Sequence, residues 1–365
     1  MRIIQVINVR WFNATAWYGL YLSRLLHEAG HEVLVLGLPG TESAAMVEKW
    51  GLPLCTLDLN TTSPWGIMRL YQELKALVRD FRPDVVNCHR GESFILWGLL
   101  KKRIGGFRLV RTRGDQRLPK NNFVNRWLHN QVADAVITTN SKMTTHFHTA
   151  FALPPTKVHQ ILGGVDQDVF YPDPEARERV RNEFGYHNHD FVLGLLGRFD
   201  RVKGQKELIQ AVAYLKSQGF THVRLLLLGF SSATSQKTVQ QWIVEHGLED
   251  ITRITGKRPD ISSCLNALDL GVIASLWSET IARAALEIMG CGVPLVATRV
   301  GVMPDLLDDE ALVPPGDVQA LAQVIASVIM NKDLQTRMHR SQSQRIKSLS
   351  GQNFLEQTLA VYQQS

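Results

Sequence analysis

The sequence predicts an α/β protein built from two domains, and three observations support this fold class. Its 365 residues are too many for one typical hydrophobic core and few for three domains. Short runs of β-branched residues and leucine alternate with amphipathic segments along the chain, as in parallel sheets whose strands are joined by helices. A content of 45% hydrophobic and 20% charged residues is typical of globular proteins and gives no support for disorder, collagen-like repeats or coiled coils.

Ten strand-like runs carry this pattern, and helical patterns separate them. Gly30 ends the first helical pattern and is followed at once by the second run, which is typical of a helix C-terminus leading into a strand. The runs are residues 3–9, 32–38, 85–88, 108–112, 135–138, 191–196, 223–228, 251–254, 270–274 and 294–297.

A break between the two halves lies in residues 163–174, which are rich in glycine, aspartate and proline. We therefore expect an N-terminal domain over residues 1–170 and a C-terminal domain over residues 171–350. Residues 351–365 predict a terminal helix with one apolar stripe. Because this stripe needs a partner, we expect the helix to pack back on the N-terminal domain.

The net charge of +6 is unevenly distributed. Residues 1–170 carry 20 Lys and Arg against 13 Asp and Glu, whereas residues 171–365 carry 20 against 21. The excess indicates either an anionic partner, such as a phosphorylated glycan, a lipid diphosphate or an acidic membrane surface, or a solvated basic face. Asp115 is the one acid within the densest basic stretch, which contains Lys101, Lys102, Arg103, Arg108, Arg111, Arg113, Arg117, Lys120 and Arg126.

No apolar run approaches the roughly 20 residues that a membrane-spanning helix needs. The first ten residues contain a short apolar run without a signal-peptide cleavage site. We therefore expect a cytoplasmic protein. Any membrane contact would be peripheral, at the inner face of the cytoplasmic membrane. The four cysteines are far apart and form no C-x-x-C pair, so we expect reduced core residues and neither a disulfide framework nor a zinc site.

A first candidate site follows the run at residues 191–196. Gly197, Arg198 and Lys203 lie between this run and the next helical pattern, so cations precede a helix N-terminus. That placement is unfavourable for the helix dipole unless an anion lies between them. We interpret the segment as a clamp for a nucleotide diphosphate, approached through the glycine; the alternative is a solvated loop. No glycine motif for a dinucleotide or for Walker-type ATP binding occurs.

A second candidate site follows the run at residues 270–274. Glu279 and Glu287 are eight residues apart, which is about 12 Å of rise if both lie on one helix. We expect Ser278 or a neighbour to cap that helix and to leave the next backbone N–H groups free for a phosphate. Two carboxylates so spaced could bind two sets of hydroxyl groups. Alternatively, Glu279 complements the helix dipole and Glu287 pairs with Arg283.

Together these segments resemble glycosyltransferase family 4, retaining enzymes with the GT-B fold, and in particular its bacterial envelope-glycan type. Glu279 and Glu287 match the E-x7-E motif of the family. The segments 164–166 and 312–317 also match, and the resemblance extends over nearly the whole chain. It implies two Rossmann-like domains facing a central cleft, and an enzyme that uses a nucleotide-sugar donor.

The resemblance also implies a role for each matching residue. Arg198 and Lys203 would hold the donor diphosphate, and Glu279 would contact the transferred sugar. Departure of the nucleoside diphosphate places negative charge on phosphate oxygens, which cations and helix N–H groups stabilise, so neither a metal nor another cofactor is expected. Such enzymes are thought to react by front-face attack within an oxocarbenium-like ion pair, without a protein nucleophile. The other donor-binding positions would be Gly197, Thr280, Ile281, Ala282, Lys257 and Arg258 for the phosphates and base, and Glu287 for the ribose.

The sequence departs from the family pattern in three places. The glycine-rich turn after the first strand is replaced by residues 13–16, the small glycine-containing run after Glu279 has no glycine, and a histidine near the end of a later strand is missing. Asp115, as a catalytic group, or Arg113 would then contact the sugar. Alternatively, Asp115 neutralises nearby arginines. Further candidate contacts to the sugar or acceptor are Asn13, Ala14, His89 and Arg113. Alternatively, His89 only caps the edge of the strand that it follows.

The sequence thus predicts a retaining transferase that moves a hexose or heptose from a UDP-, GDP- or ADP-sugar to an anionic glycan or glycolipid of the cell envelope, of lipopolysaccharide core or O-antigen type. The basic N-terminal half motivates the acceptor, and peripheral membrane contact through that half is compatible with it; no nucleic-acid partner is expected. One alternative is a catalytically degenerate nucleotide-sugar-binding subunit, since a glycine turn and a histidine are missing. A nucleotide-sugar epimerase of similar architecture is another.

Overall fold

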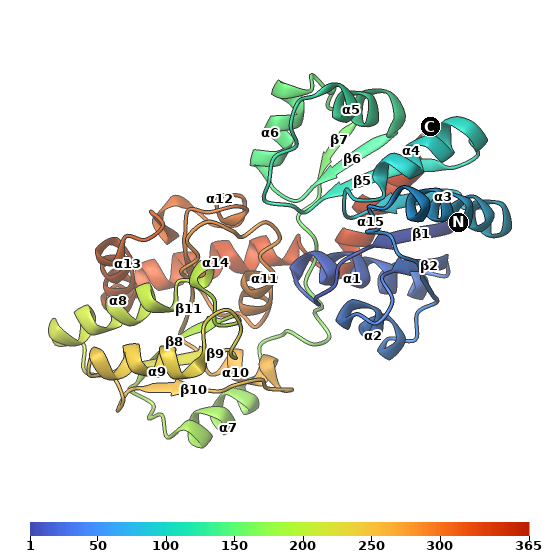
Figure 1. The fold of residues 1–365 in the computed structure, drawn as a ribbon. Helices are drawn as coiled ribbons and strands as arrows, with labels where there is room; N and C mark the ends of the chain where they lie inside the picture. Colours follow the sequence, from blue (N-terminus) through green and yellow to red (C-terminus); the bar gives the residue numbers. More distant parts are fainter. Residues whose placement is uncertain (365) are drawn as a thin grey trace. The chain divides into compact units, whose positions relative to one another are not determined.

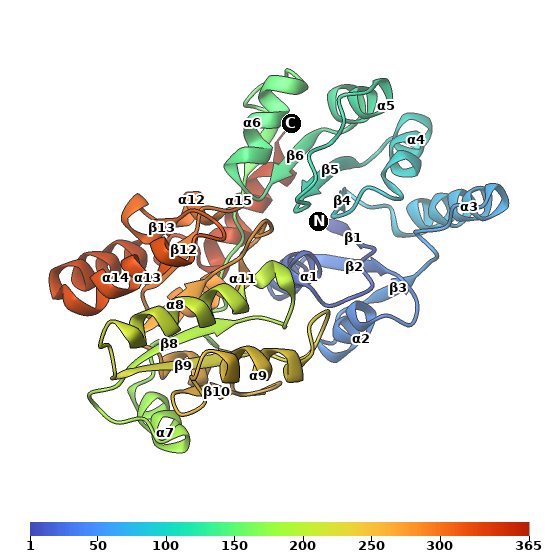
Figure 2. The same cartoon turned by 60° about the vertical axis from the view of Figure 1, so that its left-hand side comes forward.

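The computed structural model describes residues 1–364 and divides the chain into two compact units. Unit 1 contains Met1–Gly163 and the chain from Gly351 onward, and unit 2 contains Gly164–Ser350. Each unit has one parallel sheet covered by helices (Figures 1 and 2). The α/β class predicted from the alternating pattern is therefore confirmed for both units.

Unit 1 is built on a seven-stranded sheet with the order β3-β2-β1-β4-β5-β6-β7. All of its strand pairs are parallel. Two of the strands, β3 and β7, were missed in the sequence, because three residues are too few to show a period. The strands are β1 (Arg2–Ile7), β2 (Glu32–Gly37), β3 (Leu54–Thr56), β4 (Val85–Cys88), β5 (Arg108–Arg113), β6 (Ala135–Thr138) and β7 (Val158–Gln160).

The helices of unit 1 cover both faces of this sheet. Leu36 packs in one apolar core with α3, α4 and η1, whereas its neighbour Val35 packs in another with α1 and α2. Adjacent residues of a strand point to opposite faces, so these two cores lie on opposite sides of the sheet. The helices are α1 (Ala14–Glu28), α2 (Glu42–Lys49), α3 (Pro64–Phe81), α4 (Phe94–Ile104), α5 (Phe123–Arg126), the π-helix η1 (Trp127–Val132), α6 (Ser141–Ala150) and α15 (Gly351–Gln363).

Unit 2 is built on a six-stranded parallel sheet with the order β10-β9-β8-β11-β12-β13. Its strands are β8 (Phe191–Leu196), β9 (Val223–Leu228), β10 (Thr252–Ile254), β11 (Leu270–Ile273), β12 (Leu295–Thr298) and β13 (Leu312–Val313). Its helices are α7 (Pro174–Phe184), η2 (Arg201–Lys203), α8 (Gln205–Ser217), α9 (Gln236–Glu245), α10 (Ile261–Asn266), α11 (Arg283–Gly290), α12 (Met303–Leu306), η3 (Asp309–Ala311), α13 (Val318–Met330) and α14 (Lys332–Lys347).

Both sheets reverse their winding direction beside their first strand. In unit 1 this happens between β1 and β4, and in unit 2 between β8 and β11. In open α/β sheets, ligands bind beyond the carboxyl ends of the strands at such a switch point. The chain segments that follow β1, β4, β8 and β11 are therefore the places to look for a site in each unit.

No helix among residues 1–364 combines the length and the apolar character needed to cross a bilayer.

The last helix, α15, belongs to unit 1 and packs against α1. The rings of Phe354 and Tyr18 meet edge to face with their centroids 4.7 Å apart. Further along the helix, the hydroxyl of Tyr362 accepts hydrogen bonds from Gln5 Nε2 at 3.0 Å and Asn87 Nδ2 at 2.8 Å. Both amides are completely buried in the central strands, so α15 supplies an acceptor that the sheet itself lacks.

Replacing Tyr362 by phenylalanine tests this contribution. We expect the free energy of unfolding to fall by about 2 kcal/mol, because Gln5 and Asn87 would keep buried N–H groups without an acceptor. Denaturant titration followed by circular dichroism measures the loss. Tyr171→Phe, at a half-exposed ring in unit 2, is the control and should cost less than about 0.5 kcal/mol. Equal losses in the two variants would contradict the role given to the Tyr362 hydroxyl.

Candidate functional site

The turn that follows β8 is held tightly against the end of β11. Gly204 has a φ of +71°, and a Cβ atom built on it would lie 1.9 Å from the carbonyl oxygen of Ala274. No other residue fits there without moving the backbone. Between Gly197 and Gly204, the turn carries Arg198 and Lys203 at the carboxyl end of the sheet. The glycine therefore positions both cations beside the segment that follows β11.

Lys203 and Glu279, which the sequence assigned to two separate segments, form an ion pair through Nζ and Oε1. Ser275 Oγ donates a hydrogen bond of 2.5 Å to the same carboxylate oxygen. The Glu279 side chain is only 6% exposed, whereas that of Lys203 is 24% exposed. The structure thus brings the two candidate groups together at the switch point of unit 2.

The backbone of Glu279 is fixed as firmly as its side chain. Its carbonyl oxygen accepts a hydrogen bond of 2.7 Å from Val302 N. Gly301 has a φ of +61°, and a Cβ atom at this residue would lie 2.0 Å from the same oxygen. Sequence reasoning missed Ser275 and Gly301. A hydroxyl residue directly after β11 and a glycine shortly after β12 were the available signals.

The helix after Glu279 begins later than the sequence predicted. Residue Ser278 does not cap it; α11 begins at Arg283, and the preceding Ala282 occupies the N-cap position without a side-chain hydrogen bond. Ala282 has left-handed backbone angles, φ 51° and ψ 42°, which only glycine adopts without cost. Because Glu279 lies before the helix, the predicted 12 Å of helix rise to Glu287 does not apply.

Glu287 pairs with Arg283, as the alternative interpretation of the sequence proposed. Arg283 Nε donates a hydrogen bond of 2.6 Å to Glu287 Oε1. Glu287 lies on the buried side of α11, and burial raises the pKa of its carboxyl group, while the charge of Arg283 acts in the opposite direction. Thr280 and Ile281 lie in the short loop between Glu279 and the helix.

The other predicted site cations of unit 2 differ in how strongly neighbouring side chains already hold them. Arg198 is about half exposed and pairs with Asp200, with Nη2 2.9 Å from Oδ2. The ammonium group of Lys257 lies over the ring of Phe230, 4.5 Å from its centroid. Arg258 instead makes four hydrogen bonds of 2.6 to 3.0 Å to the carboxylates of Glu183 and Asp260. Arg258 is thus held by two carboxylates, whereas Arg198 pairs with one.

Asp115 in unit 1 is surrounded by three arginines. Its carboxylate lies 3.1 Å from Arg111 Nη2, 3.3 Å from Arg113 Nη1 and 3.9 Å from Arg90 Nη1. Arg111 is completely buried and also donates to the carbonyl oxygen of Cys88 at 2.7 Å. This geometry is that of an acid that neutralises its arginine neighbours.

The same cluster contains a second acid and several polar atoms without partners. Glu92 pairs with Arg90 at 2.5 Å and accepts a hydrogen bond of 3.2 Å from Asn8 Nδ2. Within the part of the chain that the structure describes, Asn8 Oδ1, Ser93 Oγ and Arg113 Nε are buried without a hydrogen-bond partner. Three arginines face two carboxylates here, so the cluster is positively charged. Burial, together with the charge of Arg111, lowers the pKa of Arg113 to about 10.

His89 and Asn13, two further candidates in unit 1, are used inside the fold. His89 Nε2 lies 2.8 Å from Gln5 Oε1 in the completely buried centre of the unit. Burial, helped by the charge of Arg111, lowers the pKa of His89 to about 3, so the ring is neutral. Asn13 Oδ1 caps α1 by accepting from Thr15 N and Ala16 N at 3.0 and 3.1 Å. Ala14 is the first residue of that helix.

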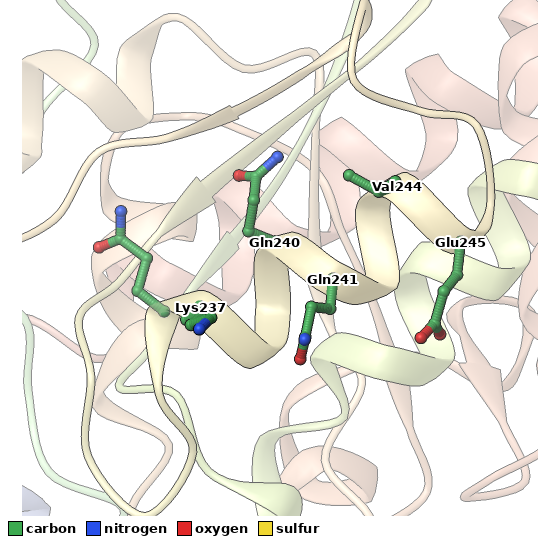
Figure 3. A pocket seen from close by; sticks show the side chains of 6 residues that line it. Lys237, Gln240, Gln241, Val244 and Glu245 are labelled. Atoms are coloured by element: carbon green, nitrogen blue, oxygen red, sulfur yellow. The ribbon is translucent and has the colours of Figure 1, made fainter.

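A hollow on the surface of unit 2 lies apart from all of these residues. Its lining side chains, five of which Figure 3 labels, all belong to α9. They project from the outer side of one helix and include no residue of the site described above. This hollow therefore adds nothing to the candidate site.

Comparison with known sequence families identifies both units. Residues 16–169 match the family Glycosyltransferase Family 4, and residues 176–345 match the family Glycosyl transferases group 1. The MMP alpha-(1->4)-mannosyltransferase of Mycolicibacterium hassiacum is 26% identical over 237 residues, covering 63% of this chain and 54% of that protein. A D-inositol 3-phosphate glycosyltransferase of Pseudarthrobacter chlorophenolicus is 27% identical over 310 residues, covering 77% and 72%. The chain spans about half the length of the first curated relatives it matches.

A solved structure shares the fold over the whole chain. The crystal structure of Anabaena Alr3699/HepE in complex with UDP superimposes with a TM-score of 0.85 and 23% sequence identity, covering 99% of both chains. At this identity the similarity establishes the fold alone. It confirms the two Rossmann-like domains of the GT-B fold that the sequence resemblance implied.

Ala282→Gly tests the strain at the start of α11. Glycine adopts the left-handed conformation freely, so we expect the free energy of unfolding to rise by about 0.5 to 1 kcal/mol. Ala285→Gly, within the same helix, should instead lower it by about 1 kcal/mol. Thermal unfolding of the two variants measures both changes. A loss of stability in Ala282→Gly would show that this residue is not strained.

Buried neutral His89 predicts a stability that falls in acid. Its pKa is about 3 in the folded chain against an ordinary 6.5, so the unfolded chain takes up the proton first as the pH drops. The stabilisation from neutral His89 is complete above pH 6.5 and is lost progressively as the pH falls toward 3. At pH 5 the loss of unfolding free energy amounts to about 2 kcal/mol. Between about pH 7.5 and pH 5, the free energy of unfolding of His89→Gln should fall by about 2 kcal/mol less than that of the original chain. The exposed His27→Gln variant should keep the full acid sensitivity.

Proposed function

Because the chain belongs to the family 4-type glycosyltransferases of GT-B fold, we propose that it transfers a sugar from a nucleotide-sugar donor and retains the anomeric configuration. One observation carries this proposal. Lys203 and Glu279, from the two segments that match the family motifs, form an ion pair at the carboxyl end of the unit 2 sheet. An ammonium group and a carboxylate held together there can bind a phosphate and a sugar hydroxyl on one ligand.

The donor diphosphate takes the place nearest to the cations. We assign Lys203 and Arg198 to its oxygens, with Gly197 and the backbone of Thr280, Ile281 and Ala282 beside them. When the bond between sugar and phosphate breaks, negative charge grows on these oxygens, and fixed cations stabilise it without rearrangement. Lys203 then exchanges its contact with Glu279 for one with phosphate, which frees the carboxylate for the sugar.

Glu287 and Lys257 complete the donor site in this proposal. Glu287 accepts from the ribose hydroxyls, and the segment at Lys257 lies beside the base. Arg258 is left out because four hydrogen bonds to two carboxylates already occupy its guanidinium group, whereas Arg198 and Glu287 each have one charged partner. UDP is the first nucleotide to test because HepE was crystallised with it, followed by GDP and ADP. The sugar is a hexose or a heptose, and the mannosyltransferase among the relatives favours a hexose.

The acceptor is an anionic glycan or glycolipid of the cell envelope, of lipopolysaccharide core or O-antigen type, reached from the cytoplasm. Its support is the positively charged cluster of Arg90, Arg111 and Arg113 at the carboxyl end of the unit 1 sheet. A phosphate on the acceptor would satisfy the buried polar atoms of Ser93 and Arg113. Several relatives are named for a phosphorylated substrate, D-inositol 3-phosphate.

Asp115 is assigned to positioning in this proposal. Its carboxylate already pairs with the guanidinium groups of Arg90, Arg111 and Arg113. It keeps Arg90 and Arg113 oriented toward the acceptor. The leaving phosphate itself takes the acceptor proton, so no residue of this chain is needed as the base.

Transfer from a panel of UDP-, GDP- and ADP-sugars to envelope glycolipid, followed by mass spectrometry, tests the proposal. Lys203→Met and Glu279→Gln should each lower the transfer rate by about 10²- to 10³-fold, the usual cost of removing one group that stabilises transition-state charge. Lys237→Met, at an exposed lysine of α9, is the control and should leave the rate unchanged. Absence of transfer with every donor, together with donor binding that Arg198→Ala leaves intact, would overturn the proposal.

The same experiment separates the two alternatives. Calorimetry that shows donor binding, with neither hydrolysis nor transfer, would indicate a degenerate binding subunit. Conversion of the donor sugar in the absence of any acceptor would indicate an epimerase.

A further inference from the structure

The carboxylate of Glu279 has two hydrogen-bond donors within residues 1–364. One is the ammonium group of Lys203 and the other is Ser275 Oγ, and both reach the same oxygen, Oε1. Only the first of them is charged. The Glu279 side chain is 6% exposed, so water contributes little to the solvation of its charge. Lys203 therefore supplies the positive charge that compensates a nearly buried carboxylate.

This carboxylate is anchored from both of its ends. The carbonyl oxygen of Glu279 accepts a hydrogen bond of 2.7 Å from Val302 N, which fixes the backbone. Ser275, which holds the carboxylate at 2.5 Å, is itself buried, and its carbonyl oxygen accepts a hydrogen bond of 2.5 Å from Thr298 Oγ1 at the end of β12. The acid therefore keeps its position when one of its donors moves away.

Lys203 is anchored only through its backbone. Gly204 packs against the carbonyl oxygen of Ala274, and Leu276 N donates a hydrogen bond of 2.8 Å to the carbonyl oxygen of Val202. The ammonium group lies at the end of a flexible side chain that is 24% exposed. A phosphate can draw this group away, and the carboxylate then remains without a charged partner. Leaving one partner of a buried pair uncompensated is unfavourable.

Two kinds of ligand differ in what they offer the carboxylate that Lys203 leaves behind. A nucleotide sugar brings sugar hydroxyl groups, which donate hydrogen bonds to a carboxylate. A bare nucleoside diphosphate brings only ionised phosphate oxygens to this place, and these accept but do not donate. Breaking the ion pair is therefore offset by new hydrogen bonds for the first ligand and not for the second.

We propose that the Lys203–Glu279 ion pair selects against bare nucleoside diphosphate, so that the site binds its substrate in preference to its product. This inference rests on the proposed function, in which the diphosphate contacts Lys203 and the sugar contacts Glu279. When the sugar has been transferred, its hydroxyl groups leave Glu279. The carboxylate then competes with the diphosphate for the ammonium group, which promotes release of the nucleotide.

Calorimetry without acceptor tests the inference. The probes are UDP, GDP and ADP, each compared with UDP-glucose, GDP-mannose or ADP-glucose of the same base. Glu279→Gln should bind the bare nucleotide on the order of tenfold more tightly than the original chain does, because a neutral amide does not hold the ammonium group. The preference for the nucleotide sugar should fall by at least the same factor.

Ser275→Ala provides a second variant, which keeps the ion pair and is expected to act in the opposite direction. The carboxylate that Lys203 leaves behind would then have no donor at all. We therefore expect the bare nucleotide to bind about threefold more weakly than to the original chain.

Two controls separate the ion pair from a general effect of charge. In the background of Lys203→Met, the further change Glu279→Gln should alter bare-nucleotide binding less than about twofold, because no ammonium group remains to be released. Glu245→Gln removes an exposed carboxylate at the end of α9 and should also change binding less than about twofold. Thermal unfolding of every variant without ligand shows whether the fold is intact.

Unchanged or weaker binding of the bare nucleotide by Glu279→Gln would overturn this inference alone. So would an equal gain in the background of Lys203→Met, which would show that the carboxylate repels the diphosphate directly. If the original chain bound none of the nucleotides and none of the nucleotide sugars, the proposed function and this inference would both be overturned.

Discussion

Both units depend on the geometry of a parallel sheet, in which all strands end at one edge. Groups that are far apart in the sequence meet there because the strands before them are hydrogen-bonded neighbours. Lys203 and Glu279 are 76 residues apart, yet they form an ion pair because β8 and β11 are adjacent. Asn8 and Glu92 meet in unit 1 because β1 adjoins β4. Strand order, more than any local motif, determines which side chains can act together.

Much of this arrangement could be predicted from the sequence, because long elements leave a period in it. The runs at residues 85–88, 135–138, 191–196 and 223–228 coincide with strands of the structure. The start of α11 could not be predicted in the same way. Ser278 is a good capping residue, but tertiary contacts to Gly301 and Val302 keep Glu279 out of the helix. Side-chain preferences do not contain that information.

The candidate sites show the same division between residue type and geometry. Glu279 and Lys203 were recognised by motif, and their contact required the structure. For Glu287 and Asp115 the sequence left open whether the carboxylate contacts a ligand or pairs with arginine. In the structure both carboxylates have arginine partners. His89 looked like a candidate contact because it ends a strand, but its ring is completely buried beside Gln5. Burial and pairing depend on neighbours that are distant in sequence, and no local pattern reports them.

The place of α15 has a consequence for the order of events on the ribosome. Unit 2 is one uninterrupted stretch of chain, whereas unit 1 is assembled from segments on both sides of it. The central strands of unit 1 emerge long before Tyr362, so Gln5 and Asn87 must wait for their acceptor until all of unit 2 has been translated. The second domain can therefore reach its native state during synthesis before the first one does, contrary to the usual N-to-C order.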